Sequence, residues 1–218
     1  MWPERPFFAD RRDAGRRLAS ALAHVEAPAP LVLALPRGGV PVGFEVARAL
    51  KAELGVLLVR KIGAPGDPEL GLGALVDGDP PQLVLNDDLV RAVAPRRGYV
   101  EAERKRQLAE IARRRRLYGV GPLSVEGRTV ILVDDGIATG GTVRAALAGL
   151  ARQHPAKVIL AVPVGPEDTV EKLRPLCDDL VCLHTPELFR AVGEHYGDFT
   201  QATDEEVVSL LAAAGEIS

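Results

Sequence analysis

The sequence has 218 residues, enough for one large domain or for a domain with a sizeable insertion. Hydrophobic residues make up 47% of the chain, so a full core can form and disorder is disfavoured except at the ends. The formal net charge of −3 disfavours nucleic acid and anionic membranes as partners, and no apolar run approaches the length of a membrane span.

The first 25 residues carry charges throughout and contain no continuous apolar segment of the kind found in signal peptides. Apolar residues recur at positions 14, 18, 21, 22 and 25, a spacing that predicts an amphipathic helix. Cys177 and Cys182 are the two cysteines, and their apolar context is typical of buried thiols in a reducing compartment. We therefore expect a soluble cytoplasmic protein.

Five short apolar runs do not alternate with polar residues, which predicts strands of a parallel sheet covered on both faces. The runs are residues 31–35, 56–59, 129–133, 158–164 and 180–184. Helical patterns follow three of them, at residues 40–50, 142–152 and 168–176. This alternation predicts an α/β fold with a doubly wound, mainly parallel five-stranded sheet in a single domain spanning residues 1–218.

The connection between the second and third runs has about seventy residues, far more than a crossover helix needs. Within it, residues 72–76 and 82–85 are predicted to pair as a hairpin. A long charged helix is predicted over residues 97–117. We interpret residues 63–128 as an insertion that forms a lid over the sheet.

The stretch VILVDDGIATGGTVRAAL, residues 130–147, places two carboxylates and a glycine-rich turn directly after a predicted buried strand. The turn leads into a helix, whose backbone N–H groups and dipole favour a phosphate monoester. Asp134 and Asp135 would repel that anion, but they can accept hydrogen bonds from the hydroxyls of a ribose attached to it. The motif predicts a ribose 5-phosphate site, with the phosphate on Ala138, Thr139, Gly140, Gly141 and Thr142.

Two other predicted strand ends carry cations. The first run is followed by PRGG, in which Arg37, Gly38 and Gly39 combine a guanidinium with close backbone approach. The second run is followed by Arg60 and Lys61, each of which taken alone could be a plain surface charge. Because the carboxyl ends of parallel strands meet at one edge of a sheet, these groups predict a pyrophosphate clamp. A diphosphate in turn implies magnesium, held mainly through phosphate oxygens rather than by a set of protein ligands.

On these residues, the chain resembles the type I phosphoribosyltransferases, and over nearly its whole length a bacterial group within that family. VILVDDGIATGGT resembles the family's phosphoribosyl pyrophosphate signature, and LPRGG its pyrophosphate loop. VRKIGAPGDP is similar to the start of the flexible lid, especially in adenine phosphoribosyltransferases. The resemblance implies transfer of the 5-phosphoribosyl group from phosphoribosyl pyrophosphate to a nitrogenous base, with purines among the candidates. It also implies Mg²⁺ as cofactor and a homodimer.

By this resemblance, Asp134 and Asp135 hold the ribose hydroxyls and residues 138–142 bind the 5′-phosphate. The pyrophosphate and its magnesium ion would meet Arg37, Gly38, Gly39 and Lys61. Transfer passes through an oxocarbenium-like state, so catalysis depends on stabilising the departing pyrophosphate and excluding water. The predicted catalytic residues are therefore Asp134, Asp135, Lys61 and Arg37. Tyr99 and the arginines at 113–116 could close over the diphosphate, or the arginines could be a solvated helix face.

Residues 185–205 are the predicted acceptor-side segment, with Phe189 and Val192 near the base. Phe189 is either a stacking platform or an ordinary packed aromatic. Ala138 stands where the enzymes for 6-oxopurines carry an aspartate, which disfavours hypoxanthine or guanine as acceptor, and Glu69 is a candidate substitute base. Gly136 stands where the family signature usually has an aliphatic residue, so we expect a slightly looser turn.

Two other functions stay open. A regulator could keep the ribose-phosphate site and bind nucleic acid through the basic helix, although the acidic total charge counts against it. A hydrolase or phosphorylase acting on ribose phosphates would release ribose 5-phosphate without any acceptor.

Overall fold

The computed structural model describes residues 6–121 and 123–215, apart from the side chain of Glu69. Its main sheet has five strands, all parallel, in the order β2-β1-β6-β7-β8. The predicted fold class is confirmed. The strands are β1 (Leu31–Ala34), β2 (Glu53–Val56), β6 (Thr129–Val133), β7 (Lys157–Val164) and β8 (Asp179–His184).

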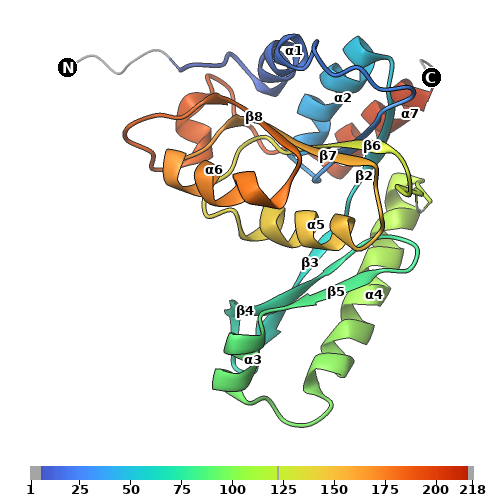
Figure 1. The fold of residues 1–218 in the computed structure, drawn as a ribbon, viewed down its shortest axis with the longest axis vertical. Coiled ribbons are helices and arrows are strands. Elements are labelled where there is room, and N and C mark those ends of the chain that lie inside the picture. Colours follow the sequence, from blue (N-terminus) through green and yellow to red (C-terminus); the bar gives the residue numbers. More distant parts are fainter. Residues whose placement is uncertain (1–5, 122, 216–218) are drawn as a thin grey trace.

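Helices cover both faces of this sheet, as a doubly wound fold requires (Figure 1). One face carries α1 (Arg11–Ala21), α2 (Gly39–Leu50) and α7 (Asp204–Gly215). The other carries α5 (Gly141–Ala151) and α6 (Glu167–Leu173), and a 3₁₀ turn at Arg174–Leu176 replaces the end of the helix predicted over 168–176. Strand β6 shows why the runs are apolar throughout: Val130 and Leu132 pack on the α5 side, and Ile131 and Val133 on the α1–α2 side.

The strand predicted over residues 56–59 is wrong in its boundaries. Strand β2 ends at Val56, which is in register with Ala34 of β1. Leu57 and Leu58 are buried in two different hydrophobic clusters, and a new strand begins at Val59. The run at residues 56–59 therefore spans a junction between two sheets. It is apolar because both sides of that junction are buried.

The segment after the junction forms a second, antiparallel sheet with its own helices, which extends away from the main sheet (Figure 1). The predicted hairpin is confirmed, and a strand that was not predicted pairs with it. A small core is built on Ile62, Ala64 and Leu72. The elements are β3 (Val59–Ala64), β4 (Asp67–Val76), β5 (Gln82–Leu85), α3 (Asp87–Val93) and α4 (Tyr99–Tyr118). Its action as a lid remains a prediction.

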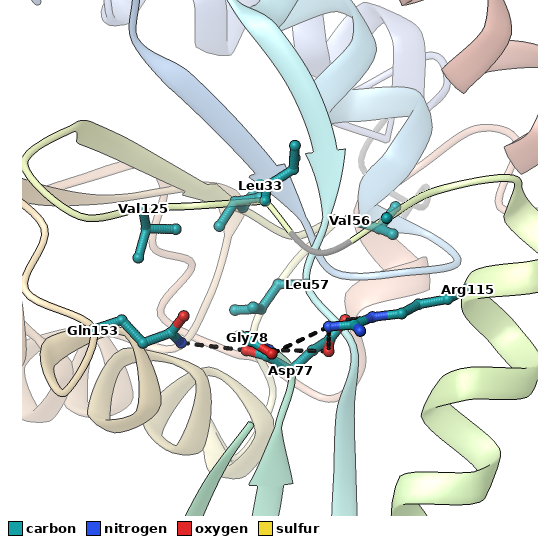
Figure 2. Close-up of a pocket in the computed structure, with 10 residues that line it drawn as sticks. Leu33, Val56, Leu57, Asp77, Gly78, Arg115, Val125 and Gln153 are labelled. Atoms are coloured by element: carbon teal, nitrogen blue, oxygen red, sulfur yellow. Dashed lines mark hydrogen bonds and ion pairs between the residues drawn. The ribbon is translucent and has the colours of Figure 1, made fainter. Parts of the chain in front are cut away.

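This second sheet is fastened to the main body at the end of β4 (Figure 2). Asp77 is 5% exposed, and Arg115 of α4 donates to both of its carboxylate oxygens and, at 3.2 Å, to the carbonyl of Gly78. Gln153, just after α5, donates to the Asp77 carbonyl at 3.3 Å. Burial raises the pKa of Asp77 despite the Arg115 guanidinium beside it. The partly buried Arg115–Asp77 ion pair is thus one of the contacts that join the two parts.

Replacing Arg115 by methionine is expected to lower the free energy of unfolding by about 2–3 kcal/mol, because Asp77 would be left buried without its cation. Chemical denaturation measures the change. The matched control is Arg116→Met, since the exposed Arg116 side chain forms no hydrogen bond or ion pair in the described part of the chain. Equal stability of the two variants would contradict the role of the Arg115–Asp77 pair.

Candidate functional site

The PRGG loop and the two aspartates come together at the carboxyl ends of β1 and β6. A Cβ added at Gly38 would overlap the Asp135 carboxylate. One added at Gly39 would lie 2.9 Å from the Val133 carbonyl oxygen and 3.1 Å from the Asp134 Cα. The Pro36–Arg37 peptide bond in this loop is cis. Both glycines thus permit a backbone approach that a side chain would prevent, as their position in the motif predicts.

Asp134 and Asp135 are adjacent carboxylates whose negative charges repel each other. The Asp135 amide donates to Asp134 Oδ1 at 2.9 Å, which fixes the first carboxylate against the turn. Burial, together with the neighbouring Asp135 charge, raises the pKa of Asp134 well above its usual range. The pair therefore includes one carboxylate, Asp134, whose negative charge is unfavourable and which hydrogen-bond donors would stabilise.

Two residues that the sequence did not reveal hold Asp135 in place. Arg11 Nε donates to Asp135 Oδ2 at 2.8 Å, and the Tyr196 hydroxyl donates to the Asp135 carbonyl at 2.6 Å. Tyr196 is 5% exposed, and its burial raises its pKa. Residues 8 and 196 also form a β-bridge, so both chain regions are tied to each other. No spacing signal could have found Arg11, which lies 124 positions from Asp135.

The glycine-rich turn, the predicted phosphate site, lies at the start of α5. Gly140 adopts a left-handed conformation with φ of 74°, and α5 begins at Gly141. Within residues 6–121 and 123–215, no group accepts a hydrogen bond from the amides of residues 138–142. Four of these five residues are exposed, namely Ala138, Thr139, Gly141 and Thr142. The amides are therefore open to a ligand, in the arrangement that suits a phosphate.

The predicted position of Arg60 and Lys61 at an end of the main sheet is wrong. Both lie within β3 of the second sheet, because β2 ends before them. Arg60 Nε donates to Gln107 Oε1 of α4 at 3.1 Å, and the Lys61 side chain runs along Gly71 of β4. Arg37, by contrast, lies in the PRGG loop, and its guanidinium has no hydrogen bond or ion pair to the described residues. A contact of Arg60 or Lys61 with pyrophosphate stays a prediction.

In the predicted acceptor-side segment, Val192 lies directly against the turn. A Cβ added at Gly136 would lie 2.5 Å from Val192 Cγ1 and 3.0 Å from Val164 Cγ1, so neighbouring side chains fill the space that a larger residue would take. A loosened turn at Gly136 is therefore not what the packing shows. Phe189 stacks on His195 with ring centroids 5.6 Å apart, which occupies one face of its ring. The side chain of Glu69 lies outside the described residues.

The arginines at 113–116 are largely engaged within the protein. Arg113 and Arg114 both donate to Glu110 and lower its pKa to about 2, and Arg115 is committed to Asp77. The Tyr99 hydroxyl donates to the Gly63 carbonyl at 3.0 Å. These contacts favour a structural role for most of the cluster over a basic binding face. None of the described helices, α4 included, is long and apolar enough to cross a membrane.

Comparison with known proteins agrees with this arrangement. A family model described as phosphoribosyl transferase domain matches residues 11–194. Two curated Mycobacterium tuberculosis proteins, each named "Putative phosphoribosyl transferase", are 50% identical to this chain over 210 residues. The aligned residues make up 95% of this chain and 47% of each curated protein, so the chain spans about half the length of these relatives. The crystal structure of the protein TT1426 from Thermus thermophilus is 46% identical, with 94% and 98% of the two chains covered and a TM-score of 0.82. The chain therefore belongs to the phosphoribosyl transferase family.

Proposed function

We propose that the protein transfers the 5-phosphoribosyl group from phosphoribosyl pyrophosphate to a nitrogenous base and releases pyrophosphate. The observation that carries this proposal is the meeting of the PRGG loop, the aspartate pair and the open amides of residues 138–142 at one edge of the sheet. Two anion sites flanking two carboxylates match a sugar that carries a phosphate at one end and a diphosphate at the other.

In the reaction, the bond from the anomeric carbon to the pyrophosphate oxygen breaks and a bond to the base nitrogen forms. Negative charge accumulates on the departing pyrophosphate, where Arg37 and the backbone around Gly38 and Gly39 would stabilise it. Asp134 and Asp135 would hold the ribose hydroxyls, so that the anomeric carbon stays between the two anion sites. Arg60 and Lys61 would act only if the second sheet brings them to the diphosphate.

Magnesium fits the donor set of this site. No cluster of three or more potential metal ligands occurs among the residues that the structure describes, but Mg²⁺ commonly takes one or two carboxylates and completes its shell with phosphate oxygens and water. Asp134 and Asp135 are hard oxygen donors at this edge of the sheet, but they are assigned to the ribose hydroxyls, so the ion would be held mainly through oxygens of the diphosphate. When bound, the ion would neutralise charge on the diphosphate.

The acceptor is a base that the site must recognise without a carboxylate at position 138. Ala138 leaves hypoxanthine and guanine as poor candidates, and other purines remain among those to test. Val192, next to the turn, and Phe189 are the proposed acceptor-side contacts, with Glu69 as a further candidate. The proposal also includes a cytoplasmic homodimer, on the family resemblance alone, and light scattering would test it against the protomer mass of 23.2 kDa.

The test is a pyrophosphate-release screen with phosphoribosyl pyrophosphate, magnesium and a panel of bases. We expect one base to support turnover and phosphoribosyl pyrophosphate alone to raise the melting temperature. Release of ribose 5-phosphate without any base would indicate a hydrolase instead. Salt-dependent nucleic-acid binding would indicate the regulator, but the pairing of Arg113, Arg114 and Arg115 gives it little support. No turnover with any base and no thermal shift would overturn the proposed function.

A further inference from the structure

Arg11 stands at the first position of α1 and reaches the centre of the proposed donor site. Asp10 caps this helix by accepting from the Asp13 amide at 2.7 Å, so the backbone that carries Arg11 is fixed. The ion pair between Arg11 and Asp135 is well shielded, with the two side chains 11% and 15% exposed. It thus differs from the exposed ion pairs on the outer helices, which contribute little to the free energy of unfolding.

Three contacts orient the Arg11 guanidinium at once. Nε donates to Asp135 Oδ2, and Nη1 donates to the Thr200 carbonyl at 2.7 Å. The guanidinium also lies over the Phe199 ring, 3.9 Å from its centroid. This combination uses the planar, forked shape of arginine, which a lysine ammonium cannot reproduce.

Asp135 is consequently held from two sides. The Arg11 guanidinium binds one carboxylate oxygen, and the Gly38 backbone packs against the same carboxyl group. A carboxylate has about four lone-pair positions, so a hydroxyl can still be accepted while Arg11 is bound. The positive charge of Arg11 also reduces the repulsion between the two adjacent carboxylates.

We propose that Arg11 is a positioning residue for donor binding: it fixes the Asp135 carboxylate in the orientation that accepts the ribose hydroxyls. This inference rests on the proposed function. Arg11 acts through Asp135 and contacts no reacting atom. The Thr200 carbonyl and the Phe199 ring hold its guanidinium in place. Residues 199–200 therefore contribute to donor binding without contacting the donor.

The test compares equilibrium binding of phosphoribosyl pyrophosphate with magnesium to the full chain and five variants. Arg11→Gln is expected to bind about tenfold more weakly, and Arg11→Lys to fall between it and the unchanged protein. Arg17→Gln is the matched control and should bind normally. Arg17 also lies in α1, forms an ion pair with Asp13, donates to the Phe7 carbonyl and lies over aromatic rings, but contacts neither aspartate of the site.

The fourth variant combines Arg11→Gln with Asp135→Asn. If Arg11 acts through Asp135, the double variant binds no more weakly than Asp135→Asn alone. A further tenfold loss in the double variant, unchanged or tighter binding by both Arg11 variants, or an equal loss in Arg17→Gln would overturn the inference while leaving the proposed function intact. Absence of binding by the unchanged protein would overturn both. If Arg11→Gln does not fold, Arg11→Lys decides by the same criteria.

Discussion

Replacing Asp134 by asparagine is expected to weaken binding of phosphoribosyl pyrophosphate about tenfold and to raise the free energy of unfolding at neutral pH. The binding loss follows because a hydrogen bond to a charged acceptor contributes about 1.5–3 kcal/mol. Adding Asp135→Asn should bring the loss to about a hundredfold. Calorimetry measures the first effect and chemical denaturation the second.

The stability gain follows from the direction of the Asp134 pKa shift. Its pKa in the folded protein lies well above the unfolded value of 3.8, so the folded state binds the proton more tightly. The free energy of unfolding therefore falls as the pH rises from 3.8 to the pKa of Asp134 in the folded protein. Above that pKa, the full cost of the buried Asp134 charge is present. Asparagine removes that cost while its amide oxygen can still accept from the Asp135 amide. The gain should disappear near pH 3.8 and below.

Donor binding by the unchanged protein should weaken on acidification at a higher pH than an ordinary aspartate would give, because the protonated Asp134 no longer carries charge. Asp88→Asn is the control, since Asp88 is exposed and its ion pair among the described residues is with Arg91 of its own helix. Loss of stability in Asp134→Asn at neutral pH, or unchanged affinity, would contradict the assignment.

Replacing Gly38 by alanine is expected to weaken donor binding at least a hundredfold with a smaller effect on folding. The added methyl group would overlap the Asp135 carboxylate, so either the loop or the carboxylate must move. Displacing either disrupts the alignment of both anion sites with the sugar between them, and losses of about this size follow small misplacements. Calorimetry and thermal unfolding on the same sample separate the two effects.

The matched control for Gly38→Ala is Gly121→Ala, where a Cβ would meet no atom within 4 Å. Normal donor binding by Gly38→Ala would show that the close approach of the PRGG loop to Asp135 is not required.

Much of the fold was predictable because a strand buried on both faces is apolar along its whole length. Strands β1, β6, β7 and β8 lie within a residue of their predicted positions for this reason. The same property explains the error at residues 56–59, where a buried junction has the composition of a buried strand. Strand β3 and helix α7 were not predicted. β3 pairs with the next strand, β4, but its residues include Arg60 and Lys61 instead of a continuous apolar run, and its register shifts between Ile62 and Ala64.

The site was predictable only where its parts are local. Asp134, Asp135 and the turn that follows lie in one short stretch, so their mutual placement can be read from it. Arg37 needs only the rule that parallel strand ends meet at one edge. Arg11 and Tyr196, in contrast, reach Asp135 across 124 and 61 positions through tertiary packing. The predicted position of Lys61 was wrong because it depended on the predicted end of β2, which lies earlier in the structure.

The contacts of Arg11 with Phe199 and Thr200 also have a consequence for the order in which the site forms during synthesis. Arg11 and Thr200 lie 189 positions apart, and the bridge between residues 8 and 196 closes a similar distance. On the ribosome, the main sheet can bring the two aspartates to the PRGG loop before residues 195–200 have emerged. Until they do, Arg11 lacks two of the three contacts that orient its guanidinium, those with Thr200 and Phe199. The growing chain would therefore bring the two aspartates to the PRGG loop before the contacts that orient Asp135 are complete.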